Sequence, residues 1–275
     1  MSLSASSPVP HAMPEDLDPD RRFGALDRLY GVGSSATLAG RHVVVAGAGG
    51  VGSWALEALA RSGVGRLTLI DMDHVAESNI NRQVQAVSRS LGQAKVAAMS
   101  ARIHDINPAC IAQQVDDFIS PDNVATLMQQ YPGVWLDCTD QVSAKLAMVV
   151  EARVQGLPLL VCGGAGGKTD PFALRAGDLS QATHDALLAR IRQQLRKHHG
   201  WPPAPAGAAR SRRRAPRMGV HCLWFGQETI RPAQWGPGHA AGLSCAGYGS
   251  AVTITATMGL AAAHWALQHA LAEAP

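Results

Sequence analysis

Short runs of β-branched and apolar residues recur along the first 160 residues, and longer segments with helical spacing separate them. The runs that predict strands lie at residues 42–46, 66–71, 111–115, 134–138 and 157–162. The segments that predict helices between them lie at residues 51–61, 91–106, 121–130 and 142–155. Such alternation is typical of parallel sheets, in which right-handed crossovers place helices on both faces. The sequence therefore predicts an α/β fold with a Rossmann-like, mostly parallel sheet.

The pattern is less regular after Gly163. A strongly basic helix is expected over residues 185–198 and a strand over residues 220–225. Threonine, histidine and glutamine interrupt the apolar stretch at residues 251–271, so we interpret it as a buried core helix rather than a membrane span. These elements are expected to form a C-terminal extension of the sheet.

The chain is expected to form one domain over residues 21–275. A Pro- and Arg-rich stretch at about residues 198–220 predicts a mobile basic loop, and residues 1–20 predict a disordered tail without the apolar segment of a signal peptide. The five cysteines are scattered and form no CxxC pair, which argues against a disulfide framework or a structural zinc site. We therefore expect a cytoplasmic protein with reduced thiols.

A glycine-rich turn follows the first predicted strand. Its sequence, GAGGVG, matches the pattern GxGxxG, with glycines at Gly47, Gly49, Gly50 and Gly52. Glycines at these positions let backbone N–H groups approach a phosphate chain at the start of a helix. Asp71 ends the next strand, where an acid accepts hydrogen bonds from ribose hydroxyls. These features predict an adenine nucleotide site but do not separate ATP from NAD.

The residues after Asp71 favour ATP. This segment is rich in polar and charged side chains, which include Asp73, Asn79, Asn81, Arg82 and Gln83. Lys95 adds a second cation near the start of the next helix, and cations stabilise the charge that builds up on departing pyrophosphate. Asp140 follows the fourth strand, where its carboxylate is placed to bind Mg²⁺. We expect Arg82, Lys95 and Asp140 to take part in catalysis.

The motifs GAGGVG, DMDxVxxSNINRQ and DCTD, together with Lys95, resemble the adenylating family of ubiquitin-activating, thiamine-pathway and molybdopterin-pathway enzymes. The resemblance implies that Asp71 and the glycine turn hold ATP, that Asn79, Arg82, Gln83 and Lys95 handle its phosphates, and that Asp140 binds magnesium. It also implies a homodimer in which an N-terminal arginine reaches the partner's site. Arg22 and Arg28 both fit that position.

Features of the second half are similar to one branch of the family, the dehydratases of threonylcarbamoyladenosine in tRNA. They are GGAGGKTDP from Gly163, the basic helix, CAGYGS from Cys245 and TITATMG from Thr253. This resemblance implies ATP-dependent cyclisation of the modified nucleoside through a carboxylate adenylate. It leaves a monovalent cation site and a sulfur-transfer partner open.

Positive charge is concentrated in the second half, although the whole chain carries a net charge of only +3. The predicted basic helix and the loop after it supply Arg190, Arg192, Arg196, Lys197, Arg210, Arg212, Arg213, Arg214 and Arg217. This tract could hold RNA phosphates, and the simpler interpretation is a solvated helix face followed by a disordered loop.

Two other functions stay open at this point. One is adenylation of the C-terminus of a ubiquitin-like sulfur-carrier protein, and the other is a scaffold that only binds nucleotide. A pure scaffold has no need of Arg82, Lys95 and Asp140 together. Relatives with thioester or persulfide intermediates keep a reactive cysteine in the second half, where this chain has Cys222 and Cys245. A buried, inert thiol is the simpler interpretation of either.

Overall fold

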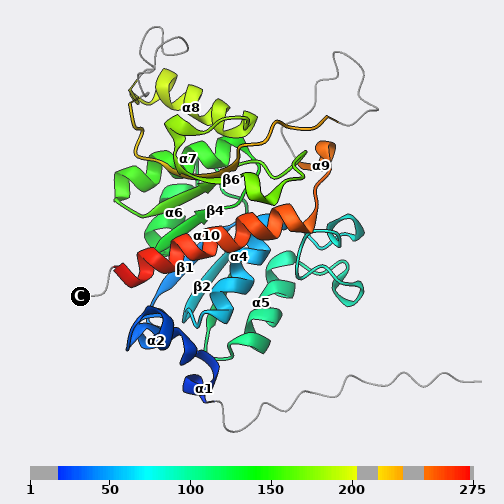
Figure 1. Cartoon of the computed structure of the whole chain (residues 1–275), viewed down its shortest axis with the longest axis vertical. Helices are drawn as coiled ribbons and strands as arrows, with labels where there is room; N and C mark the ends of the chain where they lie inside the picture. The colour runs from blue at the N-terminus through cyan, green and yellow to red at the C-terminus, as the bar shows by residue number, and fades with distance from the viewer. Residues whose placement is uncertain (1–17, 203–215, 232–244, 273–275) are drawn as a thin grey trace, which may run out of the picture.

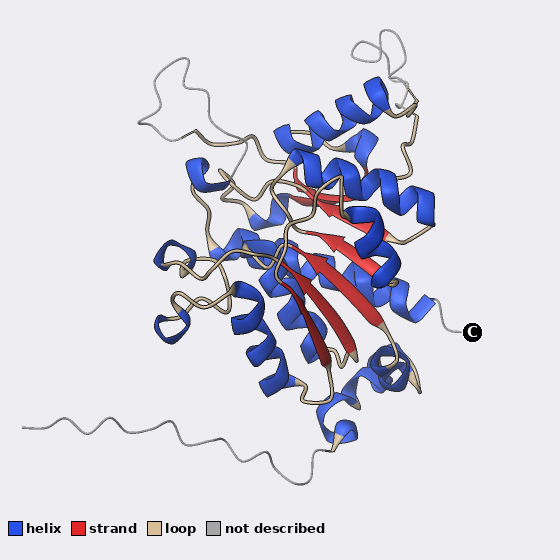
Figure 2. Ribbon diagram, turned by 180° about the vertical axis from the view of Figure 1, so that it is seen from behind, coloured by secondary structure: helices blue, strands red, loops and turns tan. Residues whose placement is uncertain are grey.

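The computed structural model describes residues 18–202, 216–231 and 245–272. Seven strands form one twisted sheet between layers of helices (Figure 2). The strand order is β3-β2-β1-β4-β5-β7-β6, and β6 alone runs antiparallel to its neighbour. The strands are β1 (His42–Ala46), β2 (Arg66–Ile70), β3 (Ile111–Val115), β4 (Val134–Asp137), β5 (Leu159–Cys162), β6 (Leu174–Asp178) and β7 (His221–Phe225). The predicted α/β fold with a mostly parallel sheet is confirmed.

Helices cover both faces of the sheet because its central strands are apolar on both sides. In β1, Val43 and Val45 pack into the core cluster that includes α4, α5 and α10, and Val44 and Ala46 pack into the one that includes α6 and α7. The side chains of a strand alternate between the two faces, which explains this division. These helices are α4 (Gly50–Arg61), α5 (Lys95–Ile106), α6 (Val124–Gln130), α7 (Val142–Gln155) and α10 (Val252–Ala272).

The C-terminal helix α10 lies across the sheet beside α4 (Figure 1). A side chain at Gly259 would come within 2.4 Å of the Val51 carbonyl oxygen and 2.8 Å of the Trp54 Cβ atom, so glycine allows the two helices to approach closely. Met258 and Ala262 of α10 are fully buried. This helix is the core element that the sequence predicts, and none of the helices in the described ranges is long and apolar enough to cross a membrane.

Several boundaries differ from the prediction. Helix α5 begins at Lys95 rather than at residue 91, and α6 begins at Val124 rather than at residue 121. Strand β6 was not predicted, because its sequence LRAGD has no apolar alternation and its exposed edge needs none. The first helix begins at Pro19, within the last two residues of the expected tail. The short helices α1 (Pro19–Phe23), α2 (Ala25–Tyr30), α3 (Ser34–Ala39) and α9 (Cys245–Tyr248) were also not predicted.

The last strand and helix α8 (Ala186–His198) build a second, smaller core. Leu188 and Ile191 of α8 pack with Trp201 and Trp224 in one buried cluster. The Asp178 carboxylate accepts hydrogen bonds from the backbone N–H groups of residues 218–220. The described ends of the predicted basic loop are therefore fixed to the domain, whereas residues 203–215 lie outside the described residues.

Candidate active site

The sheet has a topological switch point between β1 and β4. The chain proceeds from β1 through β2 to β3 on one side and returns to place β4 on the other. Ligands of open α/β sheets bind at the carboxyl ends of the strands beside such a point. A cavity of about 330 Å³ lies there. Its lining includes ten residues that the sequence predicts, namely Gly47, Gly49, Gly50, Asp71, Asp73, Asn79, Arg82, Gln83, Lys95 and Asp140.

The glycine turn lines the cavity with Gly47, Gly49 and Gly50, which carry no side chains. Gly47 has a φ of 88°, in the left-handed region, and a side chain there would lie 3.0 Å from the Cys138 backbone. Gly52 is buried in the first turn of α4 and is not among the residues that line the cavity. A Cβ atom at Gly52 would come within 1.8 Å of the Gly47 carbonyl oxygen. Gly52 therefore lets the helix pack on the turn. That it also contacts the nucleotide stays a prediction.

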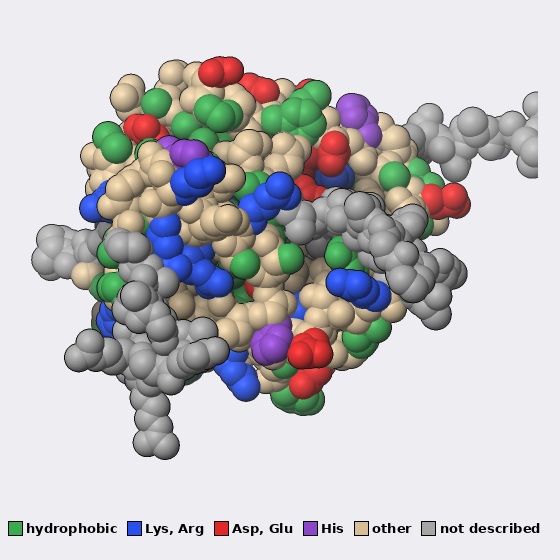
Figure 3. Space-filling model, turned by 90° about the horizontal axis from the view of Figure 1, so that it is seen from above, with side chains coloured by type: hydrophobic (Ala, Val, Ile, Leu, Met, Phe, Trp, Pro, Cys, Tyr) green, Lys and Arg blue, Asp and Glu red, His purple; other side chains and the backbone are tan. Residues whose placement is uncertain are grey.

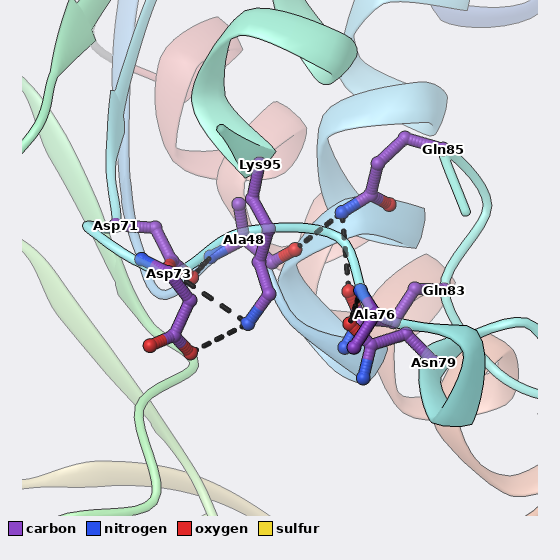
Figure 4. A network of polar contacts seen from close by, with 8 residues as sticks. All are labelled: Ala48, Asp71, Asp73, Ala76, Asn79, Gln83, Gln85 and Lys95. Atoms are coloured by element: carbon purple, nitrogen blue, oxygen red, sulfur yellow. Dashed lines mark hydrogen bonds and ion pairs between the residues drawn. The ribbon is translucent and has the colours of Figure 1, made fainter. Parts of the chain in front are cut away.

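Two acids and a lysine form a polar network beside the turn (Figure 4). Asp71 accepts a hydrogen bond from the Ala48 N–H at 2.7 Å and another from the Asp73 N–H at 2.9 Å. The Lys95 ammonium lies 2.6 Å from Asp73 and 3.9 Å from Asp71. Burial raises the pKa of Asp71, and the ammonium and the hydrogen bonds oppose that effect. The network holds one cation at the end of β2, beside the expected position of the phosphates.

Amide side chains complete this wall, and one of them was not predicted. The buried Gln85 donates hydrogen bonds to the Ala48 carbonyl oxygen at 2.8 Å and to the Gln83 side chain at 3.2 Å. It thus ties the glycine turn to Gln83 (Figure 4). Asn79 accepts a hydrogen bond from the Ala76 N–H, so its side-chain oxygen closes a turn of the backbone. The sequence offers no signal for this tie, because the burial of Gln85 exists only in the folded chain.

Arg82 is fixed through its backbone and lies at the cavity with its side chain. Its carbonyl oxygen accepts hydrogen bonds from Trp54 of α4 at 3.0 Å and from Thr255 of α10 at 3.2 Å. Its guanidinium donates to the Ser78 carbonyl oxygen and the Asn81 side chain. The C-terminal extension therefore positions a residue that lies far away in sequence.

An ion pair that was not predicted lies under the cavity. Lys145 and Asp137 are fully buried and 3.0 Å apart. The same carboxylate oxygen of Asp137 accepts hydrogen bonds from the N–H and the hydroxyl of Thr139, and Lys145 also donates to the Cys162 carbonyl oxygen. Burial raises the pKa of Asp137 against the opposing effect of Lys145. The pair joins the ends of β4 and β5 and shapes the loop that leads to Asp140.

Asp140 is exposed and lines the cavity. The described residues contain no group of three or more His, Cys, Asp or Glu side chains that could hold a metal ion. Mg²⁺ commonly takes only one or two protein carboxylates and completes its octahedral shell with phosphate oxygens and water. The exposed Asp140 carboxylate at this cavity fits that chemistry.

The cysteines with described side chains show no feature of an activated thiol. Burial raises the pKa of Cys222 well above its ordinary value, which keeps the thiol protonated. Cys138 and Cys162 have sulfur atoms 4.0 Å apart, and this contact together with burial raises the pKa of Cys138. The side chain of Cys245 lies outside the described residues.

The N-terminal arginines lie at the other end of the sheet. Arg22 donates a hydrogen bond to the carbonyl oxygen of Ile106, the last residue of α5, at 2.7 Å. Arg28 is exposed on α2, which lies near the amino ends of the strands (Figure 1). Neither arginine is near the cavity of its own chain.

Some basic side chains of α8 are exposed, whereas others hydrogen-bond to the backbone of the same domain. Arg190 and Lys197 are exposed. Arg192 donates to the carbonyl oxygens of Leu179 and Ala182, and burial lowers its pKa. Lys and Arg side chains gather on the face seen in Figure 3. Arg217 is exposed, whereas Arg210, Arg212, Arg213 and Arg214 lie outside the described residues.

The fold and the cavity define a nucleotide-binding protein of a known class. The model of the ThiF family matches residues 25–273. The chain therefore belongs to the ThiF family.

Relatives of nearly the same length are found within that family. The chain is 39% identical over 263 residues to the tRNA threonylcarbamoyladenosine dehydratase of Escherichia coli K12, which covers 92% of this chain and 95% of the relative. The crystal structure of the E. coli enzyme in complex with ATP superposes with a TM-score of 0.80 at 38% identity, over 92% of this chain and 95% of that one. The adenylyltransferase and sulfurtransferase MOCS3 of Xenopus laevis is 32% identical over 130 residues, 47% of this chain and 29% of that protein.

Proposed function

We propose that this chain is an enzyme that uses ATP to dehydrate and thereby cyclise threonylcarbamoyladenosine in tRNA. The observation that carries the proposal is the 39% identity to such a dehydratase along almost the full length of both chains. The cavity supports it, because it brings together the polar residues expected to hold ATP. The sulfur-carrier relative matches less than half of this chain, which disfavours that alternative.

The threonyl carboxylate must first be activated, because oxide is too poor a leaving group for a carboxylate to lose. The threonyl carboxylate attacks the α-phosphate of ATP and expels pyrophosphate. A nucleophile within the same modification then attacks the acyl-adenylate, closes a ring and releases AMP, so the net change is loss of water. Reactions of this kind depend mainly on positioning and on stabilisation of charge.

The described residues divide this work. Gly47, Gly49 and Gly50 leave room for the phosphate chain, and Asp71 accepts hydrogen bonds from the ribose. The cations of Lys95 and Arg82, which both line the cavity, stabilise the departing pyrophosphate. Asn79 and Gln83 line the same cavity, and Asp73 holds Lys95 in place. Mg²⁺ at Asp140 would neutralise phosphate charge.

We propose a homodimer in which Arg22 or Arg28 reaches the partner's cavity. The support is their position, because both lie at the end of the sheet opposite to the cavity of their own chain. The tRNA would contact Arg190 and Lys197 of α8, which have exposed side chains. This reaction would take place in the cytoplasm. A sulfur-transfer partner stays a proposal without support from the described thiols.

Nucleoside mass spectrometry tests the function directly. Transfer RNA that carries threonylcarbamoyladenosine is incubated with the protein, ATP and Mg²⁺. An ATP-dependent loss of one water from that nucleoside is expected. No change in the nucleoside, with pyrophosphate exchange that depends on a di-glycine carrier peptide, would assign the chain to the sulfur-carrier branch instead.

A further inference from the structure

Lys168 is a buried cation in the loop that follows β5, on the side of the cavity away from the glycine turn. Only 4% of the residue is exposed. Its ammonium donates hydrogen bonds to the carbonyl oxygens of His184 and Gln227 and to the Thr229 hydroxyl. None of the ion pairs between described residues involves Lys168. The charge is therefore satisfied by three neutral oxygen atoms, one for each of its N–H donors.

Asp185, an acid that lines the same small hollow as Lys168, is already engaged by the backbone. Asp185 accepts hydrogen bonds from the N–H groups of Leu188 at 2.9 Å and of Gly164 at 2.8 Å. It caps the start of α8 and holds the loop after β5, rather than pairing with Lys168. A buried lysine without a paired carboxylate is costly, so its surroundings must supply the compensation.

One of the three oxygen atoms around the Lys168 ammonium comes from a residue with a strained backbone. His184 has a φ of 56° and is the one described non-glycine residue in the left-handed region. Such a conformation is strained for a residue with a side chain and persists only where neighbouring structure maintains it. Its carbonyl oxygen is one of the three that accept from Lys168. The Gln227 side chain accepts from the N–H groups of Thr169 and Asp170, which holds the same segments together.

These contacts join three segments that form one wall of the active-site region. They are the loop after β5, the start of α8 and the segment after β7. A small hollow of about 40 Å³, lined by Lys168, His184 and Thr229, shares Gly164 and Leu187 with the main cavity. The position of the Gly164 N–H group, and with it the shape of the cavity, therefore depends on this wall.

We propose that the Lys168 ammonium acts as a tethered monovalent cation, which fills an oxygen cage and positions the wall of the cavity. Neutral carbonyl and hydroxyl oxygens in a compact cluster are the ligands by which proteins hold K⁺ in place of its water shell. An ammonium is also a compact point charge, so the same cluster of oxygen atoms can hold it in place of K⁺. Lys168 is a positioning residue, and this chain then needs no free K⁺ or Na⁺ at that place.

Two variants that both remove the charge test the proposal. Lys168→Ala leaves room for an ion in the cage, whereas Lys168→Met fills the space with an apolar chain of similar length. The thermal midpoint and ATP-dependent turnover are measured in KCl, NH₄Cl, NaCl and choline chloride at constant ionic strength. The effect on turnover rests on the proposed function, but the thermal midpoint does not.

In choline, both variants should lose several degrees in Tm, since about 1 kcal/mol corresponds to roughly 2–4 °C in a domain of this size. Potassium and ammonium should restore Lys168→Ala by more than half of its loss and leave Lys168→Met unchanged. Equal responses of the two variants to all four salts would overturn the proposal. A Tm response of Lys168→Ala without dehydratase activity in the wild type would contradict the proposed function alone.

The wild-type protein supplies the measurement with which the response of Lys168→Ala is compared. Its Tm and its affinity for ATP should depend less on potassium than those of Lys168→Ala, when potassium is replaced by choline at constant ionic strength. A wild-type protein that depends on potassium as strongly as Lys168→Ala would contradict the role of Lys168, because the tethered ammonium would then not replace an ion.

Discussion

The ammonium of Lys145 lies 3.0 Å from the carboxylate of Asp137, and neither side chain exposes any surface. The pair lies where β4 and β5 end, directly under the loop that carries Asp140. Removal of one partner from a buried pair leaves an uncompensated charge, which typically costs about 3–5 kcal/mol. The pair therefore couples the stability of the core to the shape of the active site.

Lys145→Met should lower the free energy of unfolding by about 3–5 kcal/mol in urea denaturation. The double variant Asp137→Leu/Lys145→Met should lose less than either single change predicts, because no charge stays buried. Since burial raises the pKa of Asp137, the folded Lys145→Met protein binds a proton more readily than the unfolded chain. Its destabilisation should thus lessen as pH falls and grow as pH rises. A loss independent of pH would contradict a lone buried carboxylate.

Substitutions at Gly52 and Gly49 should distinguish a glycine needed for helix packing from a glycine needed for nucleotide binding. A side chain at Gly52 would lie 1.8 Å from the Gly47 carbonyl oxygen, whereas at Gly49 the nearest atom is 4.0 Å away, at Gln83. Gly52→Ala should destabilise the fold by about 1–3 kcal/mol, as expected for overpacking. Gly49→Ala should leave the Tm nearly unchanged and weaken ATP binding, measured by calorimetry, because its methyl group enters the cavity. Equal effects of the two changes would argue against this division.

Arg82→Ala should reduce turnover while leaving ATP binding detectable. The guanidinium borders the cavity, and charge on pyrophosphate builds up only as the reaction proceeds. We expect ATP binding to stay detectable and kcat to fall by about 100-fold or more, as for loss of one preorganised donor. Arg89→Ala is the matched control, since Arg89 is exposed and does not line the cavity. Normal turnover of Arg82→Ala would remove this residue from the mechanism.

Asp140→Asn tests the proposed magnesium ligand. The amide keeps the shape of the side chain but lacks the charge, so the Mg²⁺ concentration for half-maximal turnover should rise about tenfold or more. Asp117→Asn serves as the control, because Asp117 also lines the cavity but hydrogen-bonds to Phe118 and Asn123. A magnesium dependence shifted equally in both variants would point to charge in the cavity rather than to a ligand.

The basic helix offers a contrast between exposed and engaged arginines. Arg190→Ala and Lys197→Ala should weaken tRNA binding and lower the salt slope by about one unit for each phosphate that the protein no longer neutralises. Arg192→Ala should lower the Tm instead, because its guanidinium holds the Leu179 and Ala182 carbonyl oxygens. Replacing Arg212, Arg213 and Arg214 with alanine should act like the first pair. Unchanged affinity and slope in these variants would exclude the tract from the interface.

Several of the predicted site residues could be found in the sequence because they lie within three residues of the end of a strand. Parallel strands end at one edge of the sheet, so Gly47, Asp71 and Asp140 meet in space although nearly a hundred residues separate the first from the last. Gln85 and Lys145 carry no comparable signal. Their importance comes from contacts with Ala48, Asp137 and Cys162, and such contacts exist only after the chain has folded.

The sequence by itself determined the parallel sheet, the glycine turn and the polar segment after β2, because these depend on local pattern and on the order of strands. Only the tertiary structure decided that Gly52 serves helix packing, that Arg192 is engaged while Arg190 is free, and that α10 holds Arg82 in place. It also placed the Lys168 ammonium among three neutral oxygens that lie 16 to 61 residues further along the chain. Each of these depends on how segments distant in sequence pack together, which local pattern does not specify.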